Sequence, residues 1–147
     1  MGTWTSRALL QGAPDDVLEL LTRPDAIARW APIPFEVHDF GRERLSAGDT
    51  LRVAGLLSGQ RVEFEVEVIV ARNGRLALLA TGPIELDVEY VARPARGGSE
   101  LHAKVAVSGR GLLGQLCARA TEALLAAGAL NVAVGRIASE LEPALAV

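Results

Sequence analysis

Three segments of the chain alternate strictly between apolar and charged or polar residues. The segment 61–70, RVEFEVEVIV, sets valines and Phe64 against glutamates, and the segments 84–91, IELDVEYV, and 100–107, ELHAKVAV, repeat the pattern. A period of two places successive side chains on opposite faces of a strand, so that one face is covered and the other meets water. The pattern is typical of an antiparallel sheet with one apolar face.

Four further segments have a less regular strand pattern: 3–10, 35–40, 50–57 and 75–82. Short turn sequences separate the later strands, at Ser58-Gly59, Asn73-Gly74, Gly82-Pro83 and Gly97-Gly98. These spacings fit hairpins and are too short for the crossovers that parallel strands need. The sequence therefore predicts seven strands in one antiparallel sheet.

Helices are expected in two places. Pro14, followed by two aspartates, is typical of a helix start, because proline fits the first turn and acids favour the positive helix end. Pro24 divides this stretch into two short helices, and the prolines of the segment APIP end the second. One long helix is expected over residues 110–142. The predicted fold is α+β, with a curved seven-stranded sheet wrapped around the long C-terminal helix and two short helices after the first strand.

The long predicted helix contains three residues, Gly128, Asn131 and Gly135, that are each about 0.5–1 kcal/mol less favourable in a helix than alanine. Steps of about 100° per residue from Arg119 place all three on the arc that faces the sheet. That arc holds Leu113, Leu116, Cys117, Ala120, Leu124, Ala127, Gly128, Asn131, Val134, Gly135 and Ala138. Two explanations are open. The small residues let the helix lie close to the sheet, with Asn131 bonded to a strand backbone or a trapped water, or they border a hollow in which Asn131 is a polar group for a ligand.

The residues that face the helix from the sheet favour the hollow. They are mostly valine, leucine, alanine and isoleucine, and the chain has only two tryptophans, one tyrosine and three phenylalanines. Small side chains on both sides do not fill the space under a wide curved sheet, so a ligand-sized cavity is expected. The candidate ligand-binding residues are Asn131, Gly128, Leu124, Cys117, Gly135, Tyr90, Trp30, Phe64 and Val88.

Three of these candidates have alternative explanations. Trp30 is either a core residue or a wall of the pocket. Tyr90 ends the apolar series of its strand, and a buried phenol needs a hydrogen-bond partner, so it is a candidate for orienting a ligand oxygen. Cys117 is expected to be a small apolar filler.

Composition excludes several function classes. The 147 residues suit one domain, and a formal charge of −3 with a pI near 5.4 gives no basic surface for nucleic acid. A single cysteine excludes a disulfide framework and a cysteine-rich metal site. No apolar run reaches the roughly 18 residues of a membrane span, so a soluble, cytoplasmic protein is expected, either monomeric or homodimeric.

Several motifs invite a chemical interpretation. The segment GRGLLG, residues 109–114, matches a dinucleotide-binding pattern, but no strand follows the expected helix, so a tight strand-to-helix corner is the preferred interpretation. The two histidines lie far apart, and neither a metal nor any other cofactor is expected. The glutamates and Asp87 of the alternating strands fall on the wet face.

No catalytic residue is assigned from these patterns. The strand phase of residues 35–57 is ambiguous, so Glu36, His38, Asp39 and Arg52 are open candidates for entering the pocket. A carboxylate that did so would be the best acid–base group.

The succession of GAPDDVLELLTRPDAIARWAP, a set of strands and GRGLLGQLCARATEALLAAG resembles the START-like, or SRPBCC, superfamily. It is most similar to the bacterial branch described as polyketide cyclase/dehydrase. The likeness rests on the order of elements, on the APxxV helix start at residues 13–17, on Trp30 and on the glycine-led final helix, and it covers nearly the whole chain.

This resemblance implies a single helix-grip domain over residues 1–147, with a deep hydrophobic pocket. Members of the superfamily bind lipids, polyketides, hormones and quinones, some are cyclases or aromatases, and one branch contains co-chaperones. The expected partner is a hydrophobic small molecule. The protein is then either a cyclase or aromatase that acts mainly by positioning, or a non-catalytic carrier or sensor of a lipid, quinone or polyketide. A partner-binding module that uses the sheet face is a third, less favoured interpretation.

Overall fold

The computed structural model describes residues 2–32, 34–38, 40–57 and 59–141. In chain order the elements are β1 (Gly2–Leu10), α1 (Pro14–Thr22), α2 (Pro24–Trp30), β2 (Phe35–His38), β3 (Thr50–Leu57), β4 (Gln60–Arg72), β5 (Arg75–Thr81), β6 (Ile84–Ala95), β7 (Gly98–Gly109), α3 (Gly111–Ala126) and α4 (Ala129–Leu141). The predicted order of strands and helices is confirmed.

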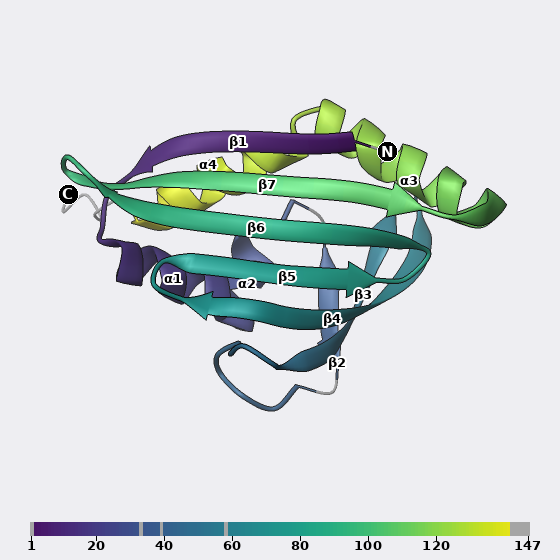
Figure 1. Cartoon of the computed structure of the whole chain (residues 1–147), viewed down its shortest axis with the longest axis horizontal. Helices are drawn as coiled ribbons and strands as arrows, with labels where there is room; N and C mark the ends of the chain where they lie inside the picture. The colour runs from purple at the N-terminus through teal and green to yellow at the C-terminus, as the bar shows by residue number, and fades with distance from the viewer. Residues whose placement is uncertain (1, 33, 39, 58, 142–147) are drawn as a thin grey trace.

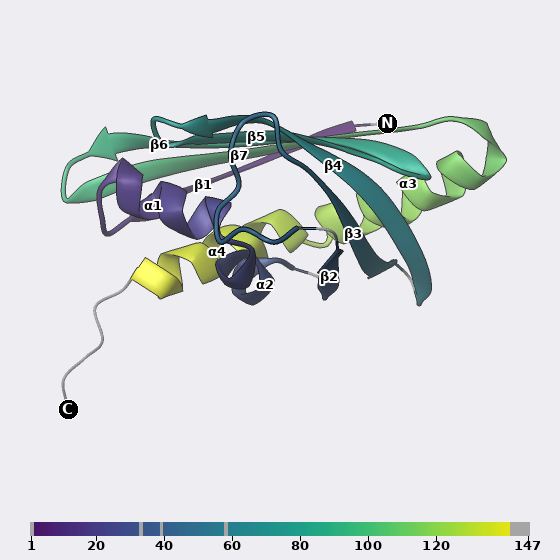
Figure 2. The same ribbon diagram turned by 90° about the horizontal axis from the view of Figure 1, so that it is seen from below.

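The seven strands form one antiparallel sheet in the order β1-β7-β6-β5-β4-β3-β2. The first strand therefore pairs with the last, and β1 and β2 are the edges (Figure 1). Figure 2 shows that the sheet curves, and that α1, α2 and α4 all lie under its concave face. The helix-grip fold expected from the sequence is confirmed.

Alternation in the strands sets which side chains face the helices. In β4, Val62, Val66 and Val68 are buried, whereas the glutamates between them are exposed. In β6 the same alternation turns Tyr90 inward, opposite Leu76 of β5 and Ala103 of β7. The inner face is consequently apolar and the outer face carries the acids, as predicted.

The two short helices pack under the sheet and supply part of the core. At the start of α1, the backbone N–H of Ala13 donates to the Asp16 carboxylate over 3.1 Å, which satisfies a backbone donor near the helix end. Val17 and Leu21 of this helix are fully buried. The helix α2 starts at Pro24 and ends at Trp30, as the prolines predicted.

The C-terminal helical region is divided, which corrects the expectation of one continuous helix. The axes of α3 and α4 meet at an angle of 53°. Gly128 lies at the break with φ of +100°, and its N–H donates to the carbonyl of Leu125 over 3.1 Å. A glycine in this left-handed conformation is a common way to end an α-helix, so Gly128 terminates α3 and does not lie inside a helix.

The start of α3 forms a close corner with the end of β7. A Cβ atom on Gly109 would lie 2.5 Å from the carbonyl oxygen of Gly114, and one on Gly114 would lie 2.9 Å from that of Pro83. Two of the glycines in GRGLLG thus permit close backbone contact, which agrees with the strand-to-helix corner. All strand pairs in the described residues are antiparallel, so the parallel unit of a dinucleotide fold is not formed there.

The same corner fixes the rotation of α3 and corrects the predicted arc. Gly114 and Ala118 are the buried residues of α3, whereas Leu113 and Leu116, which were expected to face the sheet, are 68% and 55% exposed. Leu112 is 81% exposed. The glycine contact brings the backbone of α3 against the β5–β6 turn, and the neighbouring leucines point outward as a result.

Candidate functional site

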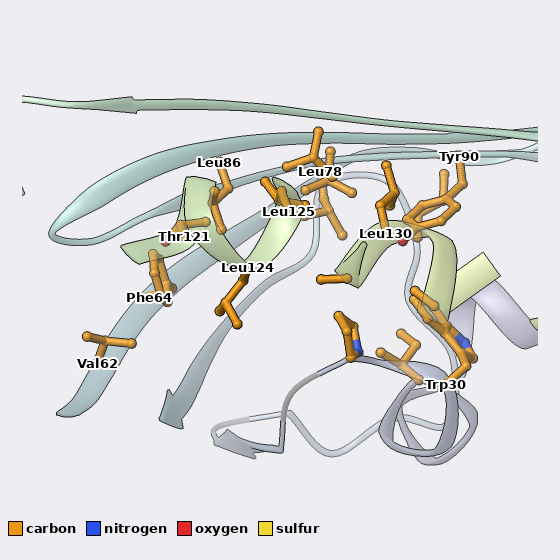
Figure 3. Close-up of a pocket in the computed structure, with 17 residues that line it drawn as sticks. Trp30, Val62, Phe64, Leu78, Leu86, Tyr90, Thr121, Leu124, Leu125 and Leu130 are labelled. Atoms are coloured by element: carbon orange, nitrogen blue, oxygen red, sulfur yellow. The ribbon is translucent and has the colours of Figure 1, made fainter. Parts of the chain in front are cut away.

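A cavity lies between the inner face of the sheet and the helices, and it has two lobes. The first, here called the α4 lobe, has a volume of about 270 Å³ and is bordered by α2, α3 and α4 (Figure 3). The second, the β2 lobe, has a volume of about 230 Å³ and lies under β2, β3 and β4. Five residues border both lobes: Ile27, Val62, Phe64, Leu78 and Leu86. The lobes are therefore adjoining parts of one apolar space.

The alternating strands explain why this space is apolar. From β4, β5 and β6 the inward positions bring Phe64, Leu78, Leu86 and Val88 to the wall. From α4 the wall receives Leu130 and Ala133. In the described residues, Tyr90 is the one ionisable side chain that lines either lobe.

Three side chains bring a polar atom to the α4 lobe, and two of these atoms are already hydrogen bonded. The indole N–H of Trp30 donates to the carbonyl oxygen of Leu20 over 2.8 Å. The hydroxyl of Thr121 donates to the carbonyl oxygen of Cys117 over 2.9 Å. Both bonds are directed to backbone groups, so these two side chains present mainly carbon to the lobe.

The third polar atom is the hydroxyl of Tyr90. The side chain is 5% exposed, and burial in apolar surroundings raises its pKa well above the usual value, so the phenol stays protonated. Its ring meets the ring of Trp30 edge to face, with centroids 5.4 Å apart and an interplanar angle of 67°. Such a contact holds an aromatic side chain in one orientation.

Five of the nine candidate residues lie on the wall of the α4 lobe: Trp30, Phe64, Val88, Tyr90 and Leu124. They come from α2, β4, β6 and α3, so the fold brings together positions that are far apart in the sequence. Figure 3 shows Trp30 and Tyr90 at one end of the lobe, with Val62 and Phe64 at the other. Their role in ligand binding stays a prediction.

The other four candidates do not line the cavity. Asn131 is exposed, and its side-chain oxygen accepts a hydrogen bond of 2.5 Å from the hydroxyl of Ser6 in β1. Gly135 is exposed on α4, Gly128 ends α3, and Cys117 is half-buried outside the wall. The expectation that Asn131 points into a hollow is wrong, because a count of 100° per residue does not continue through the break at Gly128.

Several residues that line the cavity were not among the candidates, chiefly Ile27, Leu78, Thr121, Leu130 and Ala133. Leu78 follows from the period of two in RLALLATG, where Leu76, Leu78 and Ala80 share one face. Leu130 and Ala133 would have been found by restarting the helical count at Ala129.

The charged residues of uncertain strand phase lie outside the cavity. Glu36, His38 and Arg52 are exposed, whereas the alternating positions Phe35 and Val37 line the β2 lobe. Asp39 lies outside the described residues. The described part of the chain contains no group of three histidine, cysteine, aspartate or glutamate residues arranged to hold a metal ion.

In the described ranges, no single helix has both the length and the hydropathy required to cross a membrane. The helices α3 and α4 meet these criteria only as a pair, and this pair is bent by 53°.

Comparison with solved structures places this architecture among known folds. A protein of Chromobacterium violaceum has a TM-score of 0.71 and 16% identity, with 97% of this chain and 99% of that chain covered. A START superfamily protein of Mycobacterium smegmatis has a TM-score of 0.67 and 14% identity, with 95% and 99% covered. DynU16, a protein of the dynemicin biosynthetic locus, has a TM-score of 0.62 and 23% identity, with 95% of this chain but 46% of that chain covered.

These structures share the fold of this chain at low sequence identity. No protein-family model matches the sequence, and no curated protein matches it. The predicted START-like architecture is confirmed by the structural neighbours.

Proposed function

We propose that this START-like chain binds a hydrophobic small molecule in the cavity between its sheet and its helices. The observation that carries the proposal is the two-lobed apolar space, with volumes of about 270 and 230 Å³. Apolar side chains that border this space lack the dispersion contacts that a packed protein interior provides. An apolar molecule in the cavity would restore these contacts and remove its own surface from water.

A second candidate function is catalysis of the polyketide cyclase or aromatase type. Two observations favour it: a structural neighbour from a biosynthetic locus, and the phenol of Tyr90 at one end of the cavity. Such an enzyme would hold a reactive chain in a cyclisation-ready conformation, and well-oriented intramolecular reactions gain up to about 7–11 kcal/mol. The alternative is a non-catalytic carrier or sensor of a lipid, quinone or polyketide, which the absence of other ionisable groups from the described wall supports.

Binding is tested with a neutral fluorescent probe, N-phenyl-1-naphthylamine, titrated into the protein. Leu78 and Leu79 are neighbours on β5, but Leu78 borders both lobes and Leu79 lies on the outer face. Leu78→Trp is expected to weaken probe binding at least about tenfold by filling the space, and Leu79→Trp is expected to leave it unchanged. Circular dichroism verifies that both variants are folded. If Leu78→Trp does not fold, Ala129→Leu replaces it, because it narrows the α4 lobe from the helix side.

Absence of saturable probe binding by the wild type would refute the proposed function. Equal weakening by the two tryptophan variants would place the probe elsewhere. The two candidate functions are separated by adding the protein to a poly-β-keto thioester and measuring cyclised products by mass spectrometry. A cyclase accelerates ring closure, whereas a carrier binds the chain and leaves the rate unchanged.

A further inference from the structure

The Tyr90 hydroxyl is a buried hydrogen-bond donor for which the described residues provide no acceptor. It makes no hydrogen bond to any residue that the structure describes. The described residues contain no side-chain nitrogen or oxygen atom that is both inaccessible and without a hydrogen-bond partner. Since the Tyr90 hydroxyl has no partner among them, it must border open space. Because Tyr90 is 5% exposed and lines the α4 lobe, the open space that its hydroxyl borders is the cavity.

Comparison with the other buried hydroxyls makes this arrangement specific. The hydroxyl of Thr22 donates to Leu18 over 2.8 Å, and that of Ser99 donates to Gly12 over 2.7 Å. The hydroxyl of Ser6 is bonded to Asn131. Buried polar groups are costly when they lack a partner, and the chain supplies one to each of these three. The described residues supply no such partner to Tyr90, so a molecule bound in the cavity can match this hydroxyl by bringing an acceptor.

We propose that the molecule bound in this cavity is uncharged and carries a carbonyl oxygen that accepts a hydrogen bond from Tyr90. This inference rests on the proposed binding function and specifies the chemical class of ligand. A carbonyl suits the site better than an alcohol does. An alcohol would bring a second hydroxyl proton, and a pair of hydroxyl groups leaves one proton without an acceptor.

The charge of the ligand follows from the wall. A carboxylate or an ammonium group in this space would lose its hydration, and the described lining residues include no opposite charge to compensate. The phenol remains neutral, because burial raises the pKa of Tyr90, and it therefore acts as a donor to a neutral oxygen and not as an anion.

The orientation of the ligand follows from the position of Tyr90. Figure 3 shows Tyr90 beside Trp30 and Leu130 at one end of the α4 lobe. The carbonyl group would lie at this end, and the rest of the molecule would extend past Leu78 and Leu86 toward the β2 lobe. Every described residue that lines the β2 lobe is either apolar or Gly55, so the far end of the ligand would be apolar.

The test uses three probes with one ring system: 2-acetylnaphthalene, 2-isopropylnaphthalene and 2-naphthoate. Affinities are measured by calorimetry for the wild type and for Tyr90→Phe. Loss of the Tyr90 hydroxyl is expected to weaken the binding of the ketone, 2-acetylnaphthalene, about three- to tenfold, the usual range for one hydrogen bond. The affinity of the hydrocarbon is expected to stay the same or rise. The anion is expected to bind the wild type at least about tenfold more weakly than the ketone.

Thr22→Val is the matched control, because it also removes a buried hydroxyl, but one that is bonded to backbone and lies outside the cavity wall. Thr22→Val is expected to leave the affinities for both neutral probes, 2-acetylnaphthalene and 2-isopropylnaphthalene, unchanged. If the hydrocarbon does not bind the wild type, the proposed function itself fails. If the hydrocarbon binds but Tyr90→Phe changes both neutral probes equally, or neither, only the role of Tyr90 is overturned. Binding of 2-naphthoate as tight as that of the ketone would overturn the assignment of an uncharged ligand.

Discussion

Gly128 and Gly135 look equivalent in the sequence, but the same substitution at the two positions is expected to have opposite effects on stability. Gly135 lies inside α4, is exposed, and has no heavy atom within 4 Å of the position where a Cβ would be. Alanine is favoured over glycine in a helix interior by about 0.8–1.0 kcal/mol. Gly135→Ala should therefore raise the free energy of unfolding by about 0.5–1 kcal/mol and the melting temperature by about 1–4 °C for a chain of this size.

Gly128 also has open space around its Cβ position, but its backbone φ is +100°. An L-residue in a left-handed conformation loses about 1–2 kcal/mol, and the gain in helix propensity does not apply because Gly128 stands outside both helices. Gly128→Ala should therefore lower the free energy of unfolding by about 1 kcal/mol or more. The two variants should differ by about 2 kcal/mol although each adds one methyl group.

The assay is urea unfolding followed by far-ultraviolet circular dichroism, with both variants and the wild type measured side by side. The difference in midpoint, at unchanged denaturant slope, gives the change in stability. Equal stabilisation by both substitutions would refute the reasoning, because it would mean that residues 110–142 form one continuous helix and that Gly128 is an ordinary position within it.

Two further predictions concern the side chains around the cavity. Tyr90 is the single tyrosine of the chain, so absorbance at 295 nm reports the ionisation of this side chain alone. Because burial raises the pKa of Tyr90 above the usual value of 10.0, no phenolate should form near pH 10 while circular dichroism shows a folded protein. The free energy of unfolding should fall as the pH rises above about 10, because the unfolded chain then loses the phenol proton and the folded chain keeps it. A half-developed phenolate signal at pH 10 in the folded protein would contradict the burial of Tyr90. Asn131→Leu should cost about 0.5–1.5 kcal/mol of stability by removing the acceptor of Ser6, with unchanged affinity for N-phenyl-1-naphthylamine, since Asn131 lies outside the cavity. A loss of probe affinity at unchanged stability would return Asn131 to the binding site.

The sheet was predictable because its signal is local and repeated. In β4 and β6 every second residue is apolar, and the two sides of the strand differ so strongly that the inward face needs no knowledge of the partner strands. Phe64, Val88 and Tyr90 were placed on the wall for this reason. The hairpin turns then left little freedom in the order of strands, since short connections join antiparallel neighbours.

The C-terminal region was less predictable, because its periodicity depends on uninterrupted geometry. Gly128 was recognised as a poor helix residue, but its positive φ is a property of the chain path and is not visible in composition. Once the helix breaks there, Asn131 turns from the sheet face toward the edge at β1, and Leu130 and Ala133 take the inward positions.

The rotation of α3 depends on a contact that no periodicity contains. Gly114 approaches the carbonyl oxygen of Pro83 closely, and this contact between distant segments turns Leu113 and Leu116 outward against their hydropathy. A prediction from the sequence pattern places the apolar face of a helix against the rest of the protein. Here the close approach of two backbones determines which side is covered.

If the cavity binds a hydrophobic molecule as proposed, its division into two adjoining lobes limits the length of that molecule. A compact molecule can fill the α4 lobe, of about 270 Å³, and leave the β2 lobe, of about 230 Å³, empty. Each methylene group of such a ligand that extends into the second lobe would contribute about 0.8 kcal/mol, or roughly a fourfold gain in affinity, until that lobe is full. Beyond this limit each added carbon must displace the wall or remain in water. In a homologous series of ketones, affinity would therefore rise with chain length and then level off, so that the combined length of the two lobes would select ligands by size.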